Sequence, residues 1–171
     1  SAMLAKSDIE GDVYIFDTYG LSIGGGLLIG EAAKLASEGH DMDYIMSKLE
    51  EYKEKVQVYF SVDSLDYLQK GGRISGTKAA IGTLLNIKPI LKIEDGLVKQ
   101  KTQVRGSKKI ISTLIEQLRS EVGDNFSDKD VYVGYGDDIE EHKKFMEKVK
   151  EELNPRNVYP FRIGACVACH S

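Results

Sequence analysis

Two β-rich runs separated by Asp95-Gly96 constrain the fold of this chain more than any other feature. Residues 87–93 and 97–104 carry the apolar residues Ile, Leu and Val on both sides of this pair. An Asp-Gly pair supplies the positive φ angles of a tight hairpin turn, so we expect an antiparallel β-hairpin. Pro89 cannot donate a ladder hydrogen bond, and its strand should therefore place it at an edge or beside a bulge.

Helical and strand periodicities alternate along the rest of the chain. Apolar residues recur every three or four positions after Asp41, Ser107 and Asp138, which are expected to cap amphipathic helices. The expected helices begin near Leu27, Asp41, Ser64, Thr77, Ser107 and Asp138, and the one near Ser64 ends at Gly71-Gly72. The expected strands outside the hairpin lie at residues 12–16, 56–62, 131–135 and 158–163.

This order of elements predicts the fold class. A hairpin requires antiparallel pairing, whereas strands joined through helices require crossover connections. We expect an α+β fold of two layers, with a mixed, mostly antiparallel β-sheet and helices packed on one face. Residues 1–11 are expected to form an N-terminal extension or a cloning remnant, and residues 12–171 a single domain.

Composition argues against several classes of function. The formal net charge of -4 disfavours a general nucleic-acid binder, whose phosphate contacts need a clustered excess of Lys and Arg. No apolar run approaches the roughly 20 residues of a membrane span, and the N-terminus lacks the pattern of a signal peptide. Two cysteines in 171 residues cannot make disulfides the main source of stability. We therefore expect a cytoplasmic protein.

Two motifs suggest a cofactor, and in both the ordinary interpretation is favoured. Gly24-Gly25-Gly26 could approach a phosphate, but Ile29 stands where G-x-G-x-x-G needs its last glycine. A tight turn with close backbone packing is the better interpretation. Cys166-Val-Ala-Cys169-His170 has the spacing of a c-type haem site, yet no export signal accompanies it. His40 and His142, the other conceivable metal ligands, fall at positions expected to be solvated. We expect two buried cysteines beside a polar histidine, with no metal and no cofactor.

Arg73 lies in a glycine-rich bend, directly before an apolar and small-residue run at 79–91. A guanidinium offers paired donors to a carboxylate, and each buried methylene contributes roughly 0.8 kcal/mol. The combination fits an anionic head on a long aliphatic tail, although the same wall could equally be ordinary core.

No catalytic constellation stands out. Ser61, Ser64 and Ser75 lie outside any G-x-S-x-G sequence, and H-E-x-x-H does not occur. The Asp and Glu residues fall at helix caps and on charged faces. We expect no catalytic residues and no enzyme activity.

Five segments, taken in order, resemble the C-terminal portion of the DegV family. They are FDTYGLSIGGGLL at 16–28, VYFSVDSLDYLQKGGRIS at 58–75, LLNIKPILKIEDGLV at 84–98, QVRG at 103–106 and GACVACHS at 164–171. The resemblance implies a bacterial protein that holds one long-chain fatty acid between an N-terminal α/β domain and this α+β domain. It also implies a partner, a fatty acid kinase that converts the presented acid to an acyl phosphate for phospholipid synthesis.

The resemblance carries over residue by residue. His170 matches the family's histidine near the carboxylate, and Arg73 matches the arginine that organises the head-group end. Arg105 matches an arginine on the surface that docks the kinase. The expected acyl-chain contacts are Phe60, Ile81, Leu84, Leu85, Ile87 and Ile90.

The sequence also departs from the family pattern. The N-terminal domain, with the Ser and Thr that bind the carboxylate, is absent, and the chain stops at His170-Ser171 where the family continues with G-P-G and a final strand. We therefore expect residues 12–171 to be a C-terminally truncated domain whose uncovered apolar face favours association into oligomers.

Two other functions are carried as alternatives. One is an enzyme domain of the dihydroxyacetone-kinase-like fold, in which His170 would be the catalytic group. Turnover of a small ketone would favour it. The other is a haem or metal module built on Cys166, Cys169 and His170, which a colourless and metal-free preparation would exclude.

Overall fold

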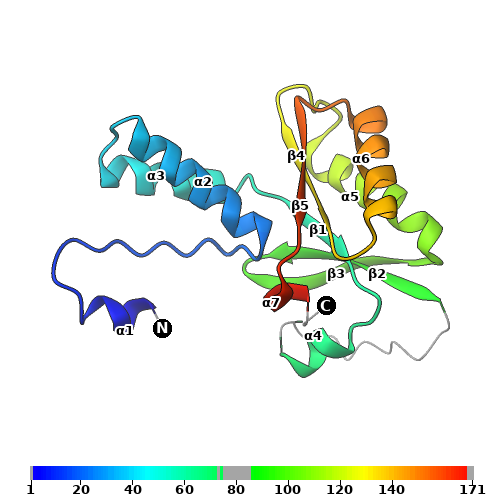
Figure 1. The fold of residues 1–171 in the computed structure, drawn as a ribbon, viewed down its shortest axis with the longest axis horizontal. Helices are drawn as coiled ribbons and strands as arrows, with labels where there is room; N and C mark the ends of the chain where they lie inside the picture. The colour runs from blue at the N-terminus through cyan, green and yellow to red at the C-terminus, as the bar shows by residue number, and fades with distance from the viewer. Residues whose placement is uncertain (1, 73, 75–85, 169–171) are drawn as a thin grey trace. The chain divides into compact units, whose positions relative to one another are not determined.

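The computed structural model describes residues 2–72, 74 and 86–168. The chain divides into two compact units, Ser1–Val56 and Gln57–Ser171 (Figure 1). The single domain predicted at residues 12–171 stays a prediction. The division after Val56 reflects separate buried cores, because one apolar cluster lies within the first unit and two others lie within the second.

The first unit is a helical hairpin preceded by an extended stretch. It contains α1 (Ala2–Lys6), α2 (Ile23–Ser37) and α3 (Met42–Lys53). Leu28 and Leu35 of α2 are buried against Ile45 and Leu49 of α3. The predicted N-cap of α3 is confirmed, since the Asp41 carboxylate accepts a hydrogen bond from the Tyr44 N–H at 2.8 Å.

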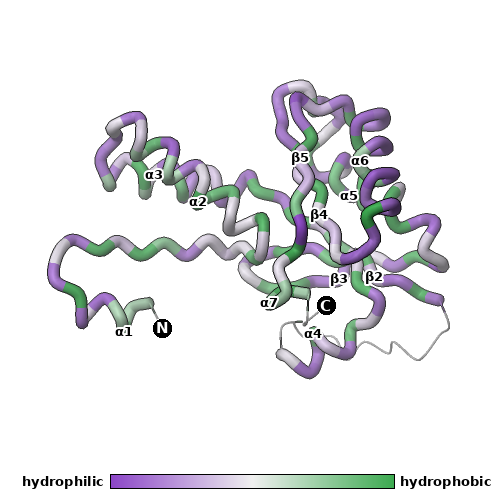
Figure 2. The backbone as a smooth tube through the Cα atoms, viewed as in Figure 1, coloured by the Kyte–Doolittle hydropathy of each residue, from purple (hydrophilic) through white to green (hydrophobic). Residues whose placement is uncertain are grey.

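The strand expected at residues 12–16 is wrong. This stretch is extended but has no strand partner among the described residues. Figure 2 shows hydrophobic residues interrupted by hydrophilic ones along it. Phe16 alone of the stretch joins the core of the first unit. An alternating pattern predicts which face of a strand would be buried, but it cannot supply the neighbouring strand.

An antiparallel sheet forms one part of the second unit. Its order is β1 (Val58–Ser61), β2 (Ile87–Glu94) and β3 (Leu97–Arg105). The predicted hairpin is confirmed, because Asp95 and Gly96 have φ angles of 55° and 72°. Pro89 lies where predicted: β1 pairing ends at Ile90, so Pro89 pairs only with β3, and a bulge follows at Ile90/Leu91.

The short helix predicted before Gly71-Gly72 is confirmed as α4 (Asp66–Lys70). The Ser64 hydroxyl accepts a hydrogen bond from the Asp66 N–H at 3.1 Å. The chain turns after the helix at Gly71, whose N–H bonds to the Tyr67 carbonyl, and Gly72 has a φ of +66°. The helix expected at 77–85 lies outside the described residues.

A parallel β-α-β unit forms the other part. The elements are η1 (Ser107–Lys109), α5 (Ile110–Val122), β4 (Asp130–Tyr135), α6 (Ile139–Leu153), β5 (Asn157–Arg162) and α7 (Ala165–Ala168). Strands β4 and β5 pair in parallel, and Ile115, Val133 and Val149 belong to the core that α5 and α6 share with them. The predicted N-cap of α6 is confirmed by a 2.8 Å bond from the Glu141 N–H to the Asp138 carboxylate.

The cap expected at Ser107 is wrong. Ser107 lies inside the 3-10 turn η1, and α5 begins three residues later without a side-chain cap. Gly106, with a φ of +81°, turns the chain into η1 instead. A glycine supplies this bend without steric cost, so no capping side chain is needed there.

The α+β class is confirmed, with the strands divided between a three-stranded antiparallel sheet and a parallel pair. Successive β2 residues point to opposite faces: Leu91 packs with Leu65 and Leu68 around α4, whereas Lys92 bonds Glu121 of α5. Helices therefore cover both faces of the antiparallel sheet rather than one. Helix α5 also contacts α6 and so links the two sheets (Figure 1).

Candidate functional site

The apolar face of the antiparallel sheet includes Leu91, from the apolar run at 79–91, and borders Phe60, an expected lipid contact. Leu91 and Val98 are buried there with Val62, Leu65 and Leu68, and we call these five residues the α4 cluster. Phe60 and Ile74 are half-buried against them, and Ile74 forms a bridge with Val98. The α4 cluster thus forms a buried apolar core on this face of the sheet.

The residues singled out from the sequence fall into two groups. Those outside the described residues are Arg73, Ile81, Leu84, Leu85 and His170. Of the others, Phe60 borders the α4 cluster, and Ile90 has no exposed area at all. Ile87 is half-buried at the start of β2, and Arg105 is exposed at the end of β3.

Ile87 and Arg105 are cross-strand partners at the open end of the hairpin. A backbone bond closes this end, because the Gly106 N–H donates to the Asn86 carbonyl at 2.8 Å. Both residues of this bond have positive φ, 76° at Asn86 and 81° at Gly106. Ile87, an expected lipid contact, and Arg105, an expected partner contact, are therefore neighbours across the hairpin. Their separation in the sequence does not predict this.

Three exposed cations follow one another at this end. Arg105, Lys108 and Lys109 make no ion pair with any described residue. Elsewhere on the same hairpin, Lys99 lies 2.7 Å from the Glu94 carboxylate. We call residues 105–109 the basic bend. Cations grouped in this way raise the local electrostatic potential.

A groove of about 420 Å³ adjoins the basic bend. One wall comes from Ser107, Lys108 and Ile111, and the other from the start of α6. The α6 wall consists of Asp138, Glu140, Glu141 and Lys144. The groove thus carries both signs of charge. Its walls lie about 30 positions apart in the sequence, so no local pattern could predict it.

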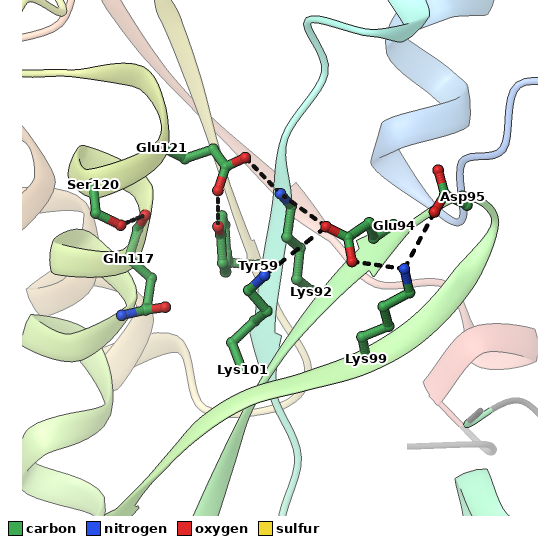
Figure 3. Close-up of polar contacts among 9 residues, drawn as sticks. All are labelled: Tyr59, Lys92, Glu94, Asp95, Lys99, Lys101, Gln117, Ser120 and Glu121. Carbon is green, nitrogen blue, oxygen red and sulfur yellow. Dashed lines mark hydrogen bonds and ion pairs between the residues drawn. The ribbon is translucent and has the colours of Figure 1, made fainter. Parts of the chain in front are cut away.

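The opposite face of the sheet carries a polar network that Figure 3 shows. The Lys92 ammonium, whose side chain is 5 % exposed, lies 2.8 Å from a carboxylate oxygen of Glu121 on α5. The Tyr59 hydroxyl donates to the other oxygen of Glu121 at 3.0 Å. These bonds, first from Lys92 and then from Tyr59, lower the pKa of Glu121. Burial, with Glu121 as the next cause, raises the pKa of Tyr59. The network fixes α5 on the sheet.

One motif escaped the sequence reasoning. Gly20-Leu-Ser22-Ile-Gly24 is a G-x-S-x-G sequence, and Ser22 is not among the serines considered above. A Cβ on Gly20 would lie 2.6 Å from the Gly25 nitrogen. Gly24, Gly25 and Gly26 lie within α2, so the tight turn expected there is wrong. The close approach of Gly20 to Gly25 does agree with the expected close backbone packing. The sequence pattern at residues 20–24 is the signal that could have singled out Ser22.

The expectations about metals and cysteines are tested only in part. Within residues 2–72, 74 and 86–168, no group of three or more His, Cys, Asp or Glu residues could hold a metal ion. Cys166 is exposed, so its predicted burial is wrong. Cys169 and His170 lie outside the described residues. His142 is buried, not solvated as expected.

A helix that spans a membrane must be long and apolar. In the part of the chain that the structure describes, no helix combines the length and apolar character that crossing a bilayer requires.

The fold and the candidate site define an α+β module with an apolar sheet face on one side of its hairpin and an exposed basic bend at the hairpin's end. The chain belongs to the DegV family: the family model, described as an uncharacterised protein family, matches residues 1–171.

Curated relatives agree with this assignment. A DegV domain-containing protein of Clostridium perfringens is 33 % identical over 177 residues, covering 100 % of this chain and 60 % of the relative. One from Clostridium acetobutylicum is 35 % identical over 158 residues, covering 92 % and 56 %. The chain thus spans about 60 % of the length of such relatives.

Solved structures of DegV proteins match nearly the whole of this chain. A DegV family protein from Thermus thermophilus, described by its fatty acid binding, is 30 % identical with a TM-score of 0.86, over 99 % of this chain and 60 % of the other. DegV of Bacillus subtilis, described as a fatty acid binding protein, is 32 % identical with a TM-score of 0.82, over 99 % and 60 %. A DegV lipid binding protein from Thermotoga maritima has a TM-score of 0.87 at 27 % identity, over 99 % and 58 %.

Proposed function

We propose that the protein containing this chain binds a long-chain fatty acid without chemical turnover, in the cytoplasm. One observation carries the proposal: 99 % of this chain matches DegV structures that are described as fatty acid binding, at TM-scores of 0.82 and 0.86. The ligand is a fatty acid rather than a cofactor. In the intact protein it lies between this part and an N-terminal domain.

The acyl chain rests on the apolar wall of this part. The proposed contacts are Phe60, Ile81, Leu84, Leu85, Ile87 and Ile90. Among the described ones, Phe60 and Ile87 keep accessible surface, whereas Ile90 is fully covered. Ile90 lies two positions from Lys92 on β2 and so points to the α5 face, which makes it the weakest of the proposed contacts. Each methylene that leaves water contributes roughly 0.8 kcal/mol, so a long chain supplies most of the affinity.

The carboxylate lies near Arg73 and His170. An arginine presents paired donors to a carboxylate, and a charge-assisted bond of this kind is stronger than a neutral one. Replacing Arg73 or His170 by Ala in the intact protein should therefore weaken retention of the head group. Unchanged binding in both variants would remove these residues from the site.

The test is organic extraction of the intact protein after purification, followed by mass spectrometry of the extract. We expect a long-chain fatty acid at close to one molecule per chain. Protein that is empty on purification, and that also takes up neither oleate nor palmitate when these are added, would refute the proposal.

We further propose that the bound acid is presented to a fatty acid kinase for phospholipid synthesis, with Arg105 on the docking surface. The exposed cations of the basic bend, which make no ion pair with a described residue, support this role, because opposite charge speeds protein association. Arg105→Glu should slow acyl phosphate formation at limiting kinase while fatty acid binding stays unchanged. Lys150→Glu, at another exposed lysine without an ion pair to a described residue, is the matched control. An equal loss in both variants would point to net charge rather than to a docking surface.

A further inference from the structure

The parallel strands β4 and β5 pack one of their faces against helices and turn the other face away from them. Val131, Val133 and Val158 belong to the core that these strands share with α5 and α6, and both helices lie on that side (Figure 1). Side chains alternate along a strand, so Tyr132 and Tyr159 point to the opposite side. Parallel strands are normally covered on both faces, so this second face is expected to have an occupant.

We call this second face the aromatic face, and it is made by Tyr132, Gly134, Tyr159 and Phe161. These residues form two cross-strand pairs, Tyr132 with Tyr159 and Gly134 with Phe161. The two tyrosine rings stack, with 4.9 Å between their centroids. A Cβ on Gly134 would lie 2.3 Å from Cζ of Phe161, so the Phe161 ring lies over the glycine. Three aromatic rings therefore follow one another on this face.

The aromatic face is accessible. Tyr159 is 41 % exposed, and Tyr132 and Phe161 are half-buried. None of the buried apolar clusters that the described residues form includes any of these three rings. Apolar side chains that are grouped on a surface, unlike single ones, mark a site of interaction.

The aromatic face and the proposed lipid contact Phe60 lie on the same side of their sheets. Helix α5 covers the face of β2 that carries Lys92 and the face of β4 that carries Val133. Phe60 pairs with Leu91 and packs against the α4 cluster, on the opposite face of the antiparallel sheet. Both surfaces therefore face away from α5, and one extended ligand can contact both.

The charges beside the aromatic face indicate the chemistry of its ligand. The Arg156 guanidinium donates hydrogen bonds to the Asp130 carboxylate at 2.9 and 2.6 Å, and the Asn157 amide donates another at 2.9 Å. This arginine is therefore already bound and is not free for the phosphate of a nucleotide, the other kind of ligand that stacks on aromatic rings. An uncharged aliphatic chain needs no cation, and it gains free energy from each methylene that leaves water.

We propose that the aromatic face binds the part of the fatty acyl chain that lies furthest from the carboxylate, an inference that rests on the proposed function. Arg73, which is proposed to hold the carboxylate, directly precedes Ile74, and Ile74 forms its bridge with Val98 in the antiparallel sheet. The aromatic face belongs to the other sheet. Only the far end of a long tail therefore reaches it, and a short acid binds without it.

The test is the affinity of the intact protein for stearate and for decanoate, which has the same carboxylate and a much shorter tail. Tyr159→Ala removes the most exposed ring of the aromatic face. It should weaken stearate binding about tenfold, the loss expected from about two methylenes without contact, and leave decanoate binding unchanged. Tyr44→Ala is the matched control, because Tyr44 is 42 % exposed but lies on α3. It should change neither affinity.

A second variant, Gly134→Ala, disturbs the aromatic face without removing a ring. The added methyl group has to displace the Phe161 ring, so stearate binding should again weaken more than decanoate binding, while circular dichroism reports whether the fold is retained.

Three results would overturn the inference. An equal loss for both acids, or no difference between Tyr159→Ala and Tyr44→Ala, would do so while fatty acid binding itself stands. If Tyr159→Ala lowers the melting temperature of the intact protein but not that of the 171-residue chain, and both affinities stay unchanged, then protein rather than lipid covers the aromatic face. A parent protein that binds neither acid would overturn the proposed function as well.

Discussion

At the scale of single residues, His142 shows how a polar residue can occupy a core position. His142, Phe145, Val149 and Leu153 recur at three- and four-residue spacings along α6, so they share the face that packs against the strands. The His142 ring stacks on the Tyr135 ring, with 4.2 Å between the two ring centroids. Both ring nitrogens are buried, and neither has a hydrogen-bond partner among the residues that the structure describes. The helical period predicts this burial, whereas the charged neighbours of His142 in the sequence favour an exposed position.

Replacing His142 by Phe should stabilise the protein. The variant keeps an aromatic ring beside Tyr135 and removes two unsatisfied nitrogens, and a buried unsatisfied polar group costs about 1–3 kcal/mol. The gain should grow as the pH falls. Burial lowers the pKa of His142 from 6.5, so the unfolded chain binds a proton that the folded chain excludes. The parent chain therefore loses stability as the pH falls below about 6.5. Urea unfolding at pH 7.5 and 5.5 measures both effects.

His40→Phe is the control for this prediction. The His40 side chain is 37 % exposed, and a surface replacement of this kind should change the free energy of unfolding by no more than about 0.5 kcal/mol. A His142→Phe variant that is less stable than the parent at both pH values would show that a water or another group satisfies the ring.

At the scale of elements, the polar face between the sheet and α5 carries a buried cation. Lys92 lies on the central strand, with its ammonium 2.8 Å from Glu121 and 3.8 Å from Glu94. A buried ion pair contributes little net stability, but removing one partner leaves the other charge uncompensated. The two ends of the Lys92–Glu121 contact should therefore respond differently to replacement.

A double-mutant cycle tests this asymmetry. Glu121→Gln removes the charge that neutralises Lys92 and should destabilise the protein by about 1–3 kcal/mol, below the cost for a fully buried pair because Glu121 is 37 % exposed. Lys92→Met should be nearly neutral, and adding it to Glu121→Gln should restore most of the loss. Urea unfolding of the four chains measures the coupling energy.

Lys143→Met, which breaks an exposed pair with Glu140, is the matched control and should cost less than about 1 kcal/mol. If Lys92→Met proves as damaging as Glu121→Gln, the lysine stem rather than its charge supports the packing.

The elements that the sequence predicted correctly are those fixed by local chemistry. Asp41 and Asp138 cap their helices, and Asp95-Gly96 closes the hairpin, because each needs only its immediate neighbours. The strand at 12–16 failed because a strand also requires a partner. The φ angle of 55° at Ser22 depends on the approach of Gly20 to Gly25, which no reading of single positions provides.

At the scale of the whole molecule, the residues of the candidate site were predicted from the family resemblance. The structure describes only those on β1 and on the β2–β3 hairpin. Phe60, Ile87 and Ile90 lie on β1 and β2, and Arg105 lies at the end of β3. Ile87, a proposed lipid contact, and Arg105, a proposed docking residue, are cross-strand partners. The sequence could not predict this, since register depends on the bulge at Ile90/Leu91 as well as on the turn. The chain covers about 60 % of the length of such relatives, so the proposed site is tested in the intact protein.

Ligand linkage in the intact protein tests the proposed division between tail and head group. A ligand that binds only the native state stabilises it by about 2.7 kcal/mol at a free concentration of 100 times Kd, so oleate should raise the melting temperature. Methyl oleate has the same tail but no charge for Arg73 to bind, and it should produce a clearly smaller shift. In Arg73→Ala the two shifts should converge, mainly through loss of the oleate effect. Equal shifts from both ligands in the parent protein would show that the tail alone is recognised, and Arg73 would then have no part in holding the carboxylate.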